Sequence, residues 1–130
     1  MSSLENSRTH AMISRVDGLE AGREYLPGEL AKAVGVARSS IGSYLSDEKV
    51  FPPTSVNNSG RKYDKSTARA LAVFIALLKP PFGFKRSDAY TVLSRVNADD
   101  CWEHLARSNK ELLLHIVGSG QIDDIINREQ

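Results

Sequence analysis

The expected fold of this chain is decided by the stretch Leu26-Pro-Gly-Glu-Leu-Ala-Lys-Ala-Val-Gly-Val-Ala-Arg-Ser-Ser-Ile-Gly-Ser-Tyr-Leu45. It contains two runs of residues at helical spacing, which are Leu30, Ala31 and Val34, followed by Ile41, Tyr44 and Leu45. Gly35 separates the two runs and has an apolar residue on each side. We therefore expect two short helices joined by a glycine-containing turn, which is the arrangement of a helix-turn-helix.

The second expected helix has an outward face of small or hydrogen-bonding residues. Such a face suits a close approach to phosphates and base edges in a DNA major groove. The residues expected to approach the groove are Arg38, Ser39, Ser40 and Ser43, with Gly42 on the same face. Lys32 and Tyr44 are expected near phosphates. The alternative interpretation is an ordinary helical hairpin in a small core.

Length and composition predict a globular protein. The 130 residues, of which 41% are hydrophobic and 25% charged, are enough for one domain with a core of its own, or for a small domain plus an accessory element. The longest apolar run, from Ala70 to Leu78, is about half as long as a membrane-spanning helix. Residues 1–20 do not have the pattern of a secretion signal. The single cysteine, Cys101, excludes an intrachain disulfide and fits a reducing cytoplasm, where we expect the protein. Association with the nucleoid is expected from the predicted binding to DNA.

Basic residues are concentrated in the middle of the chain, although the net charge is only +1. From Arg23 to Arg86 there are 11 basic and 5 acidic residues, whereas the part from Ser87 onward has 4 basic and 8 acidic residues. A basic middle and an acidic tail are typical of a nucleic-acid-binding module joined to a segment with another role. A solvated surface could have the same distribution by chance.

A small hairpin is expected after the two helices. Pro52-Pro53 excludes a helix, and Asn57–Gly60 favours a turn. The extended pieces are expected at Val50-Phe51 and Arg61–Tyr63. A hairpin beside a helix-turn-helix is a wing, and its basic residues would lie against phosphates; they are Arg61 and Lys62. The alternative is a polar loop in which Tyr63 fills a place in the core.

Two further helices are expected behind the hairpin. Asp64 is expected to cap a helix that runs to about Lys79 and ends before Pro80-Pro81. Its inward stripe is predicted to be Leu71, Phe74, Ile75 and Leu78. Ser87 is expected to cap a shorter helix with the inward residues Ala89, Val92, Leu93 and Val96.

From Tyr25 to Val96 the chain resembles the winged helix-turn-helix DNA-binding domain of the mercury-resistance-regulator (MerR) family. The matching pieces are Glu29–Val36, Ile41 with Tyr44, Val50–Pro52, Arg61–Tyr63 and Gly83-Phe84. The resemblance implies a mainly α fold with a small β-hairpin wing and a C-terminal dimerisation helix. It also implies dimeric, sequence-specific binding to near-palindromic DNA. The family's DNA-contacting positions correspond here to Arg38, Tyr44, Arg61 and Tyr63.

The chain departs from the family pattern at several positions. Gly42 stands where the family usually has a phosphate-contacting arginine, and Ala37 replaces a serine that caps the recognition helix. Gly60 replaces an aromatic residue, and Arg86 stands where an apolar residue is common. Gly42 also costs the helix about 1 kcal/mol relative to alanine. The resemblance is therefore to a divergent, short relative without an effector domain, and small-molecule sensing is not expected.

In the tail from Asn97 to Gln130, one helix of roughly 30 Å is expected, which starts near Asp99 and Asp100 and runs up to Gly118–Gly120. We expect it to form a homodimer through Trp102, Leu105, Leu112, Leu113 and Ile116. The alternative is that this stripe packs back on its own domain. A last amphipathic turn, with Ile122, Ile125 and Ile126, would seal the interface or bind another protein. The expected organisation is thus a polar arm over residues 1–23, disordered or loosely helical, a DNA-binding domain over 24–96 and an oligomerisation segment over 97–130.

The three residues Cys101, His104 and His115 recur on one side of the expected tail helix. They could form a metal site across a dimer, but structural zinc usually has four Cys or His ligands at denser spacing. We therefore expect a buried thiol and surface imidazoles, with no metal and no cofactor. A Cys/His nucleophile pair would need a third, orienting group, and none accompanies these residues. No enzyme activity is expected.

Three functions are compatible with these patterns. The favoured one is a dimeric transcriptional regulator that binds double-stranded DNA sequence-specifically. The second is an architectural DNA-binding factor of the excisionase or plasmid-segregation type, which bends or coats DNA at repeats. The third is a protein-interaction adaptor that does not bind DNA.

Overall fold

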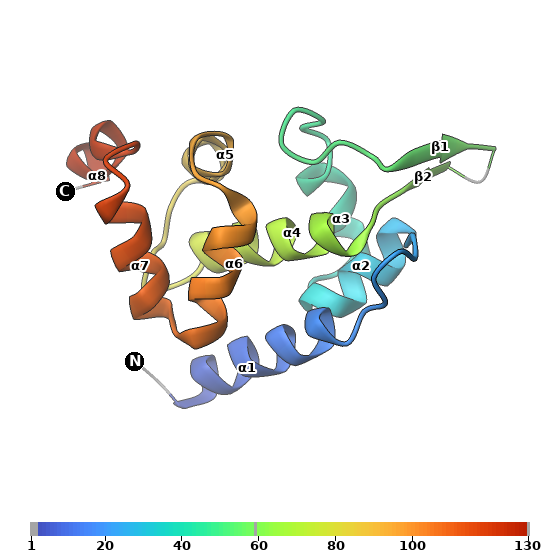
Figure 1. The fold of residues 1–130 in the computed structure, drawn as a ribbon, viewed down its shortest axis with the longest axis horizontal. Coiled ribbons are helices and arrows are strands. Elements are labelled where there is room, and N and C mark those ends of the chain that lie inside the picture. Colours follow the sequence, from blue (N-terminus) through green and yellow to red (C-terminus); the bar gives the residue numbers. More distant parts are fainter. Residues whose placement is uncertain (1–2, 59, 130) are drawn as a thin grey trace. The chain divides into compact units, whose positions relative to one another are not determined.

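The computed structural model describes the backbone of residues 3–58 and 60–129 and the side chains of residues 8–58 and 60–127. The described residues form eight helices and one antiparallel hairpin, so the protein is mainly helical, as predicted (Figure 1). The chain divides into two compact units between Ala72 and Val73, called the N-terminal and the C-terminal unit below. The functional boundaries expected after residues 23 and 96 stay a prediction.

The elements are distributed over both units. The N-terminal unit contains α1 (Ser3–Asp17), α2 (Pro27–Val34), α3 (Arg38–Tyr44), β1 (Ser55–Asn57), β2 (Gly60–Lys62) and the beginning of α4 (Lys65–Leu78). The C-terminal unit contains the end of α4, α5 (Arg86–Arg95), α6 (Ala98–Arg107), α7 (Asn109–Gly118) and α8 (Asp123–Glu129). None of the helices described is both long and apolar enough to span a bilayer.

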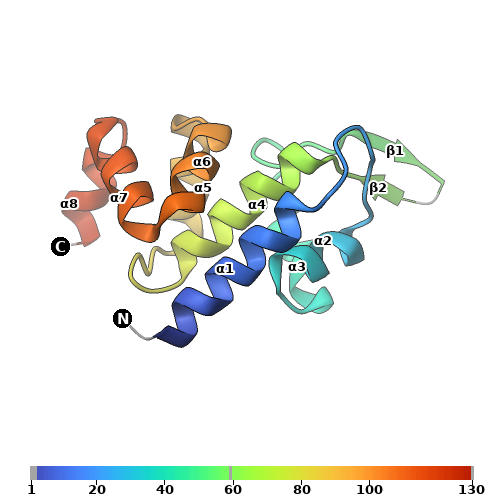
Figure 2. The same ribbon diagram turned by 60° about the horizontal axis from the view of Figure 1, so that its bottom comes forward.

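Helix α1 packs on α2 in the N-terminal unit (Figure 2). Its buried apolar residues are Met12 and Val16. Arg15 Nε donates a hydrogen bond to the carbonyl of Ala33 at 3.0 Å. Lys65 Nζ donates to the carbonyl of Asp17 at 2.7 Å. Both carbonyls lie at helix C-termini, where positive charge is favourable. The sequence analysis expected a disordered or loosely helical arm over residues 1–23. The contacts that hold α1 join residues far apart in the sequence, so no local pattern indicated them.

Helix α2 ends at Gly35, as predicted. Pro27 occupies the first turn, where a missing N–H costs no helical hydrogen bond. Glu29 Oε1 accepts a hydrogen bond from the N–H of Leu26 at 3.0 Å. Gly35 ends the helix with φ of 75° and ψ of 35°, a left-handed conformation that glycine adopts without steric cost. The inward residues of α2 and α3 are buried; they are Leu30, Ala31, Val34, Ile41 and Leu45.

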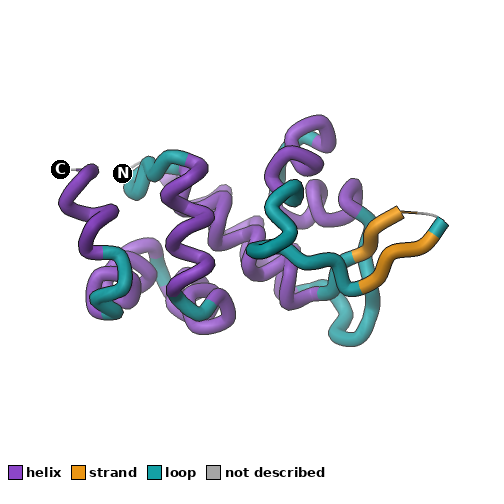
Figure 3. Tube along the Cα trace, turned by 90° about the horizontal axis from the view of Figure 1, so that it is seen from above, coloured by secondary structure: helices purple, strands orange, loops and turns teal. Residues whose placement is uncertain are grey.

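The β1–β2 hairpin follows α3 and extends away from the helices of its unit (orange in Figure 3). The first strand was expected at Val50-Phe51, and that prediction is wrong. These residues lie in a turn, and Phe51 is fully buried. Pro52-Pro53 has no N–H to donate to a partner strand. Pairing therefore starts only at Thr54, whose N–H donates to the carbonyl of Lys62 at 2.8 Å.

Helix α4 begins at the predicted cap, because Asp64 Oδ1 accepts a hydrogen bond from the N–H of Thr67 at 3.0 Å. It ends at Leu78, just before Pro80-Pro81, as predicted. Of the predicted stripe, the buried members are Leu71, Phe74 and Ile75, and Leu78 is half-buried.

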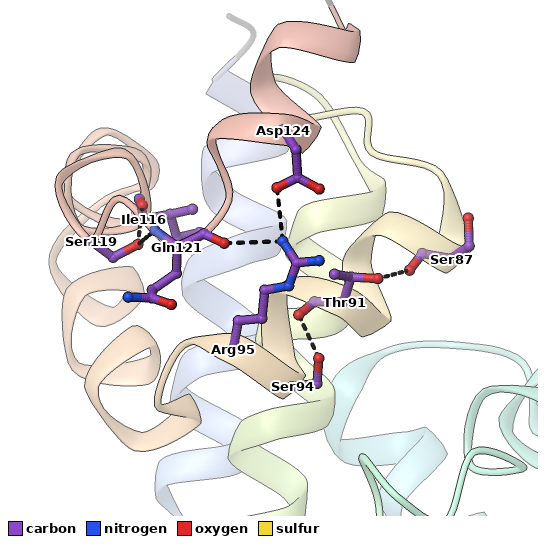
Figure 4. Close-up of polar contacts among 8 residues, drawn as sticks. All are labelled: Ser87, Thr91, Ser94, Arg95, Ile116, Ser119, Gln121 and Asp124. Carbon is purple, nitrogen blue, oxygen red and sulfur yellow. Dashed lines mark hydrogen bonds and ion pairs between the residues drawn. The ribbon is translucent and has the colours of Figure 1, made fainter.

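Helix α5 starts earlier than predicted, and Ser87 is not its cap. The cap position is Lys85, which has an extended backbone and whose carbonyl accepts a hydrogen bond from the N–H of Ala89 at 2.9 Å. Ser87 lies inside the first turn, where its carbonyl accepts a hydrogen bond from Thr91 Oγ1 at 3.0 Å (Figure 4). A serine in this position cannot cap because its own backbone is already helical.

The expected single tail helix is two helices, α6 and α7, which pack against each other. Ser108 interrupts the helix with φ of −175° and ψ of 163°, and its Oγ accepts a hydrogen bond from the N–H of Glu111 at 3.1 Å. The prediction of one long helix is therefore wrong. Each of the two short helices buries its own apolar stripe, and the two stripes follow each other in the sequence at 3–4 residue spacing. The pattern of apolar residues therefore did not show the break.

Helix α8 is held by a polar contact to the end of α5 in the C-terminal unit. Arg95 Nη1 donates to the carbonyl of Gln121 at 3.1 Å and pairs with Asp124 Oδ1 at 2.8 Å (Figure 4). Ile122 and Ile125 are fully buried. The last apolar turn predicted from the sequence therefore belongs largely to the core of its own unit.

Candidate nucleic-acid interface

Apart from Arg38, the outward face of α3 consists of short side chains, as predicted. Arg38, Ser39 and Ser43 are exposed, whereas Ser40 and Tyr44 are half-buried. The remaining position is Gly42, and a Cβ added there would meet nothing within 4 Å. Apart from one arginine, no long side chain therefore projects from this face. Such a surface can approach another molecule closely along the helix.

Gly42→Ala is expected to stabilise the protein by about 0.5–1 kcal/mol, because alanine costs less backbone entropy in a helix and meets no neighbour here. Urea denaturation of both proteins measures the difference.

Gly35→Ala is the matched control for this substitution. Its φ is positive, and a Cβ would lie 2.8 Å from Nη2 of Arg15, so this variant is expected to be less stable than wild type. A loss of stability in Gly42→Ala would show that the outward face of α3 is covered.

Arg38 lies across the first turn of α2. Its Nε is 3.4 Å and its Cζ 3.5 Å from the position that a Cβ on Gly28 would take. A Cβ at Gly28 would therefore be in ordinary van der Waals contact with the guanidinium. In the part of the chain that the structure describes, no carboxylate lies within ion-pair distance of Arg38. Its positive charge is available to a ligand.

The hairpin brings a second arginine into the site, but this one is already paired. Arg61 Nη1 lies 2.6 Å from Glu48 Oε1, and both side chains are half-exposed. Glu48 belongs to the turn that follows α3, so the ion pair joins this turn to β2. The sequence did not indicate the pair, because its members lie in separate elements. Lys62, the neighbouring basic residue, is half-buried.

Tyr63 lies in the core rather than on the hairpin surface. It is 1% exposed, and its backbone forms a two-way bridge with Tyr25, with N–H to carbonyl distances of 2.6 and 2.9 Å. Burial raises the pKa of the Tyr63 hydroxyl, while Arg61 acts in the opposite direction through its charge and a hydrogen bond. Its ring therefore fills the core, as the alternative interpretation proposed, and it does not face a ligand.

Lys32 is exposed on α2, at the rim of an open depression of about 460 Å³. Two other cations line this depression, but each has a structural partner. Arg23 pairs with Glu29 at 3.2 Å and lies over the ring of Tyr25, and Arg15 caps the end of α2. The depression is thus mainly a product of the packing between α1 and α2.

The structure places the predicted dimerisation residues mostly inside the C-terminal unit. The buried ones are Trp102, Leu105, Leu112 and Ile116, as expected if the stripe packs back on its own chain. Leu113 is 41% exposed and lies beside two other exposed apolar residues of α7, Leu114 and Val117. A dimer surface in the described tail would therefore have to use this other side of α7.

His104 and His115 meet across the α6–α7 hairpin. Their rings stack with centroids 4.1 Å apart, and His104 Nδ1 lies 2.8 Å from the carbonyl of Asp100. Cys101 is fully buried, and burial raises the pKa of its thiol to about 11. Within the described residues no three Cys, His, Asp or Glu side chains are arranged to hold a metal ion.

No family model matches this chain, and comparisons with curated proteins and with solved structures give no significant match. The resemblance to the MerR family therefore stays a prediction.

Proposed function

We propose that the N-terminal unit is a winged helix-turn-helix that binds double-stranded DNA, and that the protein acts as a dimeric transcriptional regulator. In this proposal α3 enters the major groove, and the β1–β2 hairpin is the wing on the flanking phosphates. Arg38, Ser39 and Ser43 approach base edges, whereas Lys32 and Arg61 meet phosphates. The half-buried residues of the site would contact the DNA only at its edges; they are Ser40, Tyr44 and Lys62.

The observation that carries this proposal is the outward face of α3. Short side chains let a recognition helix lie close to base edges, and an arginine among them can contact a base directly. The face offers serine hydroxyls, an open glycine and one arginine without an ion-pair partner in the described chain. The projecting hairpin with two basic residues, and the resemblance of residues 25–96 to the MerR family, support the same function.

In-vitro selection of bound duplexes, followed by footprinting, tests the proposal. A single near-palindromic site supports the regulator, because the symmetry of a dimer is repeated in its operator. Protection of several tandem direct repeats would instead support the architectural factor. If no duplex is enriched and none binds at low salt, the proposal is wrong and the adaptor function takes its place.

Dimerisation is the part of the proposal that rests on the resemblance. The exposed apolar residues of α7, Leu113, Leu114 and Val117, are the surface that the described tail offers for it. Sedimentation velocity over a range of protein concentrations measures the association directly. A monomer at every concentration, free and bound to DNA, would remove the dimer from the proposal.

A further inference from the structure

The ion pair between Glu48 and Arg61 joins two elements of the proposed interface. Glu48 lies in the turn after α3, and Asp47 organises this turn. Asp47 Oδ1 accepts hydrogen bonds from the N–H groups of Lys49 and Val50 at 3.1 and 3.4 Å. The fully buried Phe51 anchors the end of the turn. Glu48 therefore starts from a fixed backbone, while Arg61 lies on the projecting hairpin.

The ion pair between Glu48 and Arg61 matters for ligand binding rather than for the stability of the fold. Both side chains are half-exposed, so water screens their attraction and it contributes little to folding. However, the carboxylate oxygen 2.6 Å from Arg61 Nη1 occupies the place that a phosphate oxygen would take. Arg61 Nη1 cannot donate to a phosphate oxygen in that place until Glu48 has moved away. The released carboxylate would then remain close to the negatively charged DNA.

We propose that Glu48 is a negative determinant of nucleic-acid affinity that acts by competing with DNA phosphates for Arg61. The inference rests on the proposed function of the N-terminal unit. In the free protein the pair is electrically neutral, so wild type releases few counterions when Arg61 meets a phosphate. Without the carboxylate, Arg61 presents a full charge, and its phosphate contact releases counterions.

Glu48→Gln is expected to bind a mixed-sequence duplex about fivefold more tightly than wild type at low salt. The slope of log affinity against log salt should become steeper by about 0.9, the contribution of one phosphate that is neutralised by an unpaired cation. Fluorescence anisotropy titrations of a labelled duplex at a series of KCl concentrations measure both quantities. Thermal unfolding of both proteins checks that the fold is unchanged.

Glu24→Gln is the matched control, because it removes the same charge from an exposed position of the same unit. It should raise the affinity less than Glu48→Gln does. A second comparison adds Glu48→Gln to Arg61→Ala, where the substitution should lose most of its effect because the competition no longer exists.

Equal gains in Glu48→Gln and Glu24→Gln, or a full gain that persists in the Arg61→Ala background, would overturn the role of Glu48 and leave DNA binding intact. If neither wild type nor Glu48→Gln binds any duplex at low salt, the proposed function itself fails, and this inference fails with it.

Discussion

Arg38→Ala is expected to weaken the binding of selected duplexes by about 1–3 kcal/mol, the usual contribution of an arginine that contacts a base edge. The effect should be large because Arg38 is the only basic residue of α3. Gly42 cannot replace the lost contact, since it has no side chain. Anisotropy titrations with the selected duplex and with a scrambled duplex measure the loss, which should be greater for the selected sequence.

Arg8→Ala is the control for the charge that this substitution removes. Arg8 is exposed on α1, so its loss should weaken binding to both duplexes slightly and equally. Arg38→Lys separates charge from geometry, because lysine keeps the charge but loses the planar fork that can donate two parallel hydrogen bonds. Unchanged affinity in Arg38→Ala for a duplex that wild type selects would remove α3 from the interface.

Leu112→Ala is expected to lower the free energy of unfolding by about 2–5 kcal/mol, because it leaves a cavity in a fully buried position. From the sequence pattern we expected Leu112 in a dimer interface, with packing on its own domain as the alternative. If its main contacts were with a second chain, the loss would depend on protein concentration. Urea denaturation at low and at high protein concentration therefore distinguishes the packed α6–α7 hairpin from a dimer.

Leu114→Ala makes the same chemical change two residues further along α7. Leu114 is 57% exposed, so the stability of the folded chain should change by less than about 0.5 kcal/mol. If the proposed dimer uses this side of α7, Leu114→Ala will instead weaken self-association in sedimentation velocity. Similar and concentration-independent losses in the two variants would contradict the described packing of α7.

Local features of the fold were predictable from the sequence. The turn at Gly35, the cap at Asp64 and the end of α4 before Pro80-Pro81 were all predicted correctly. Each depends on backbone sterics or on a hydrogen bond within a few residues. The first strand and the cap of α5 were predicted wrongly. At α5 the serine is a common capping residue, but the helix begins before it. At Val50-Phe51 the prolines that follow prevented pairing, although the apolar pair resembled a strand.

The sequence predicted most residues of the candidate site, but it did not predict the contacts that they make with the rest of the chain. Arg38 and the open face of α3 follow from helical spacing within one element. The missed residues are Gly28 and Glu48. A glycine just inside an expected helix was a sign that something passes close to it, since glycine there costs stability. Glu48 gave no such sign, because its contact with Arg61 crosses from a turn to a strand.

The sequence by itself determined that the chain is mainly helical, that α2 ends at Gly35, that α4 runs from Asp64 to the prolines, and which face of α3 points outward. Only the tertiary structure decided that Ser108 folds the tail stripe onto itself, that Tyr63 is a core residue, and that Arg61 is paired before any ligand arrives. The physical reason is the range of the interactions. Backbone sterics and capping act over a few residues, whereas burial and ion pairing depend on the path of the whole chain.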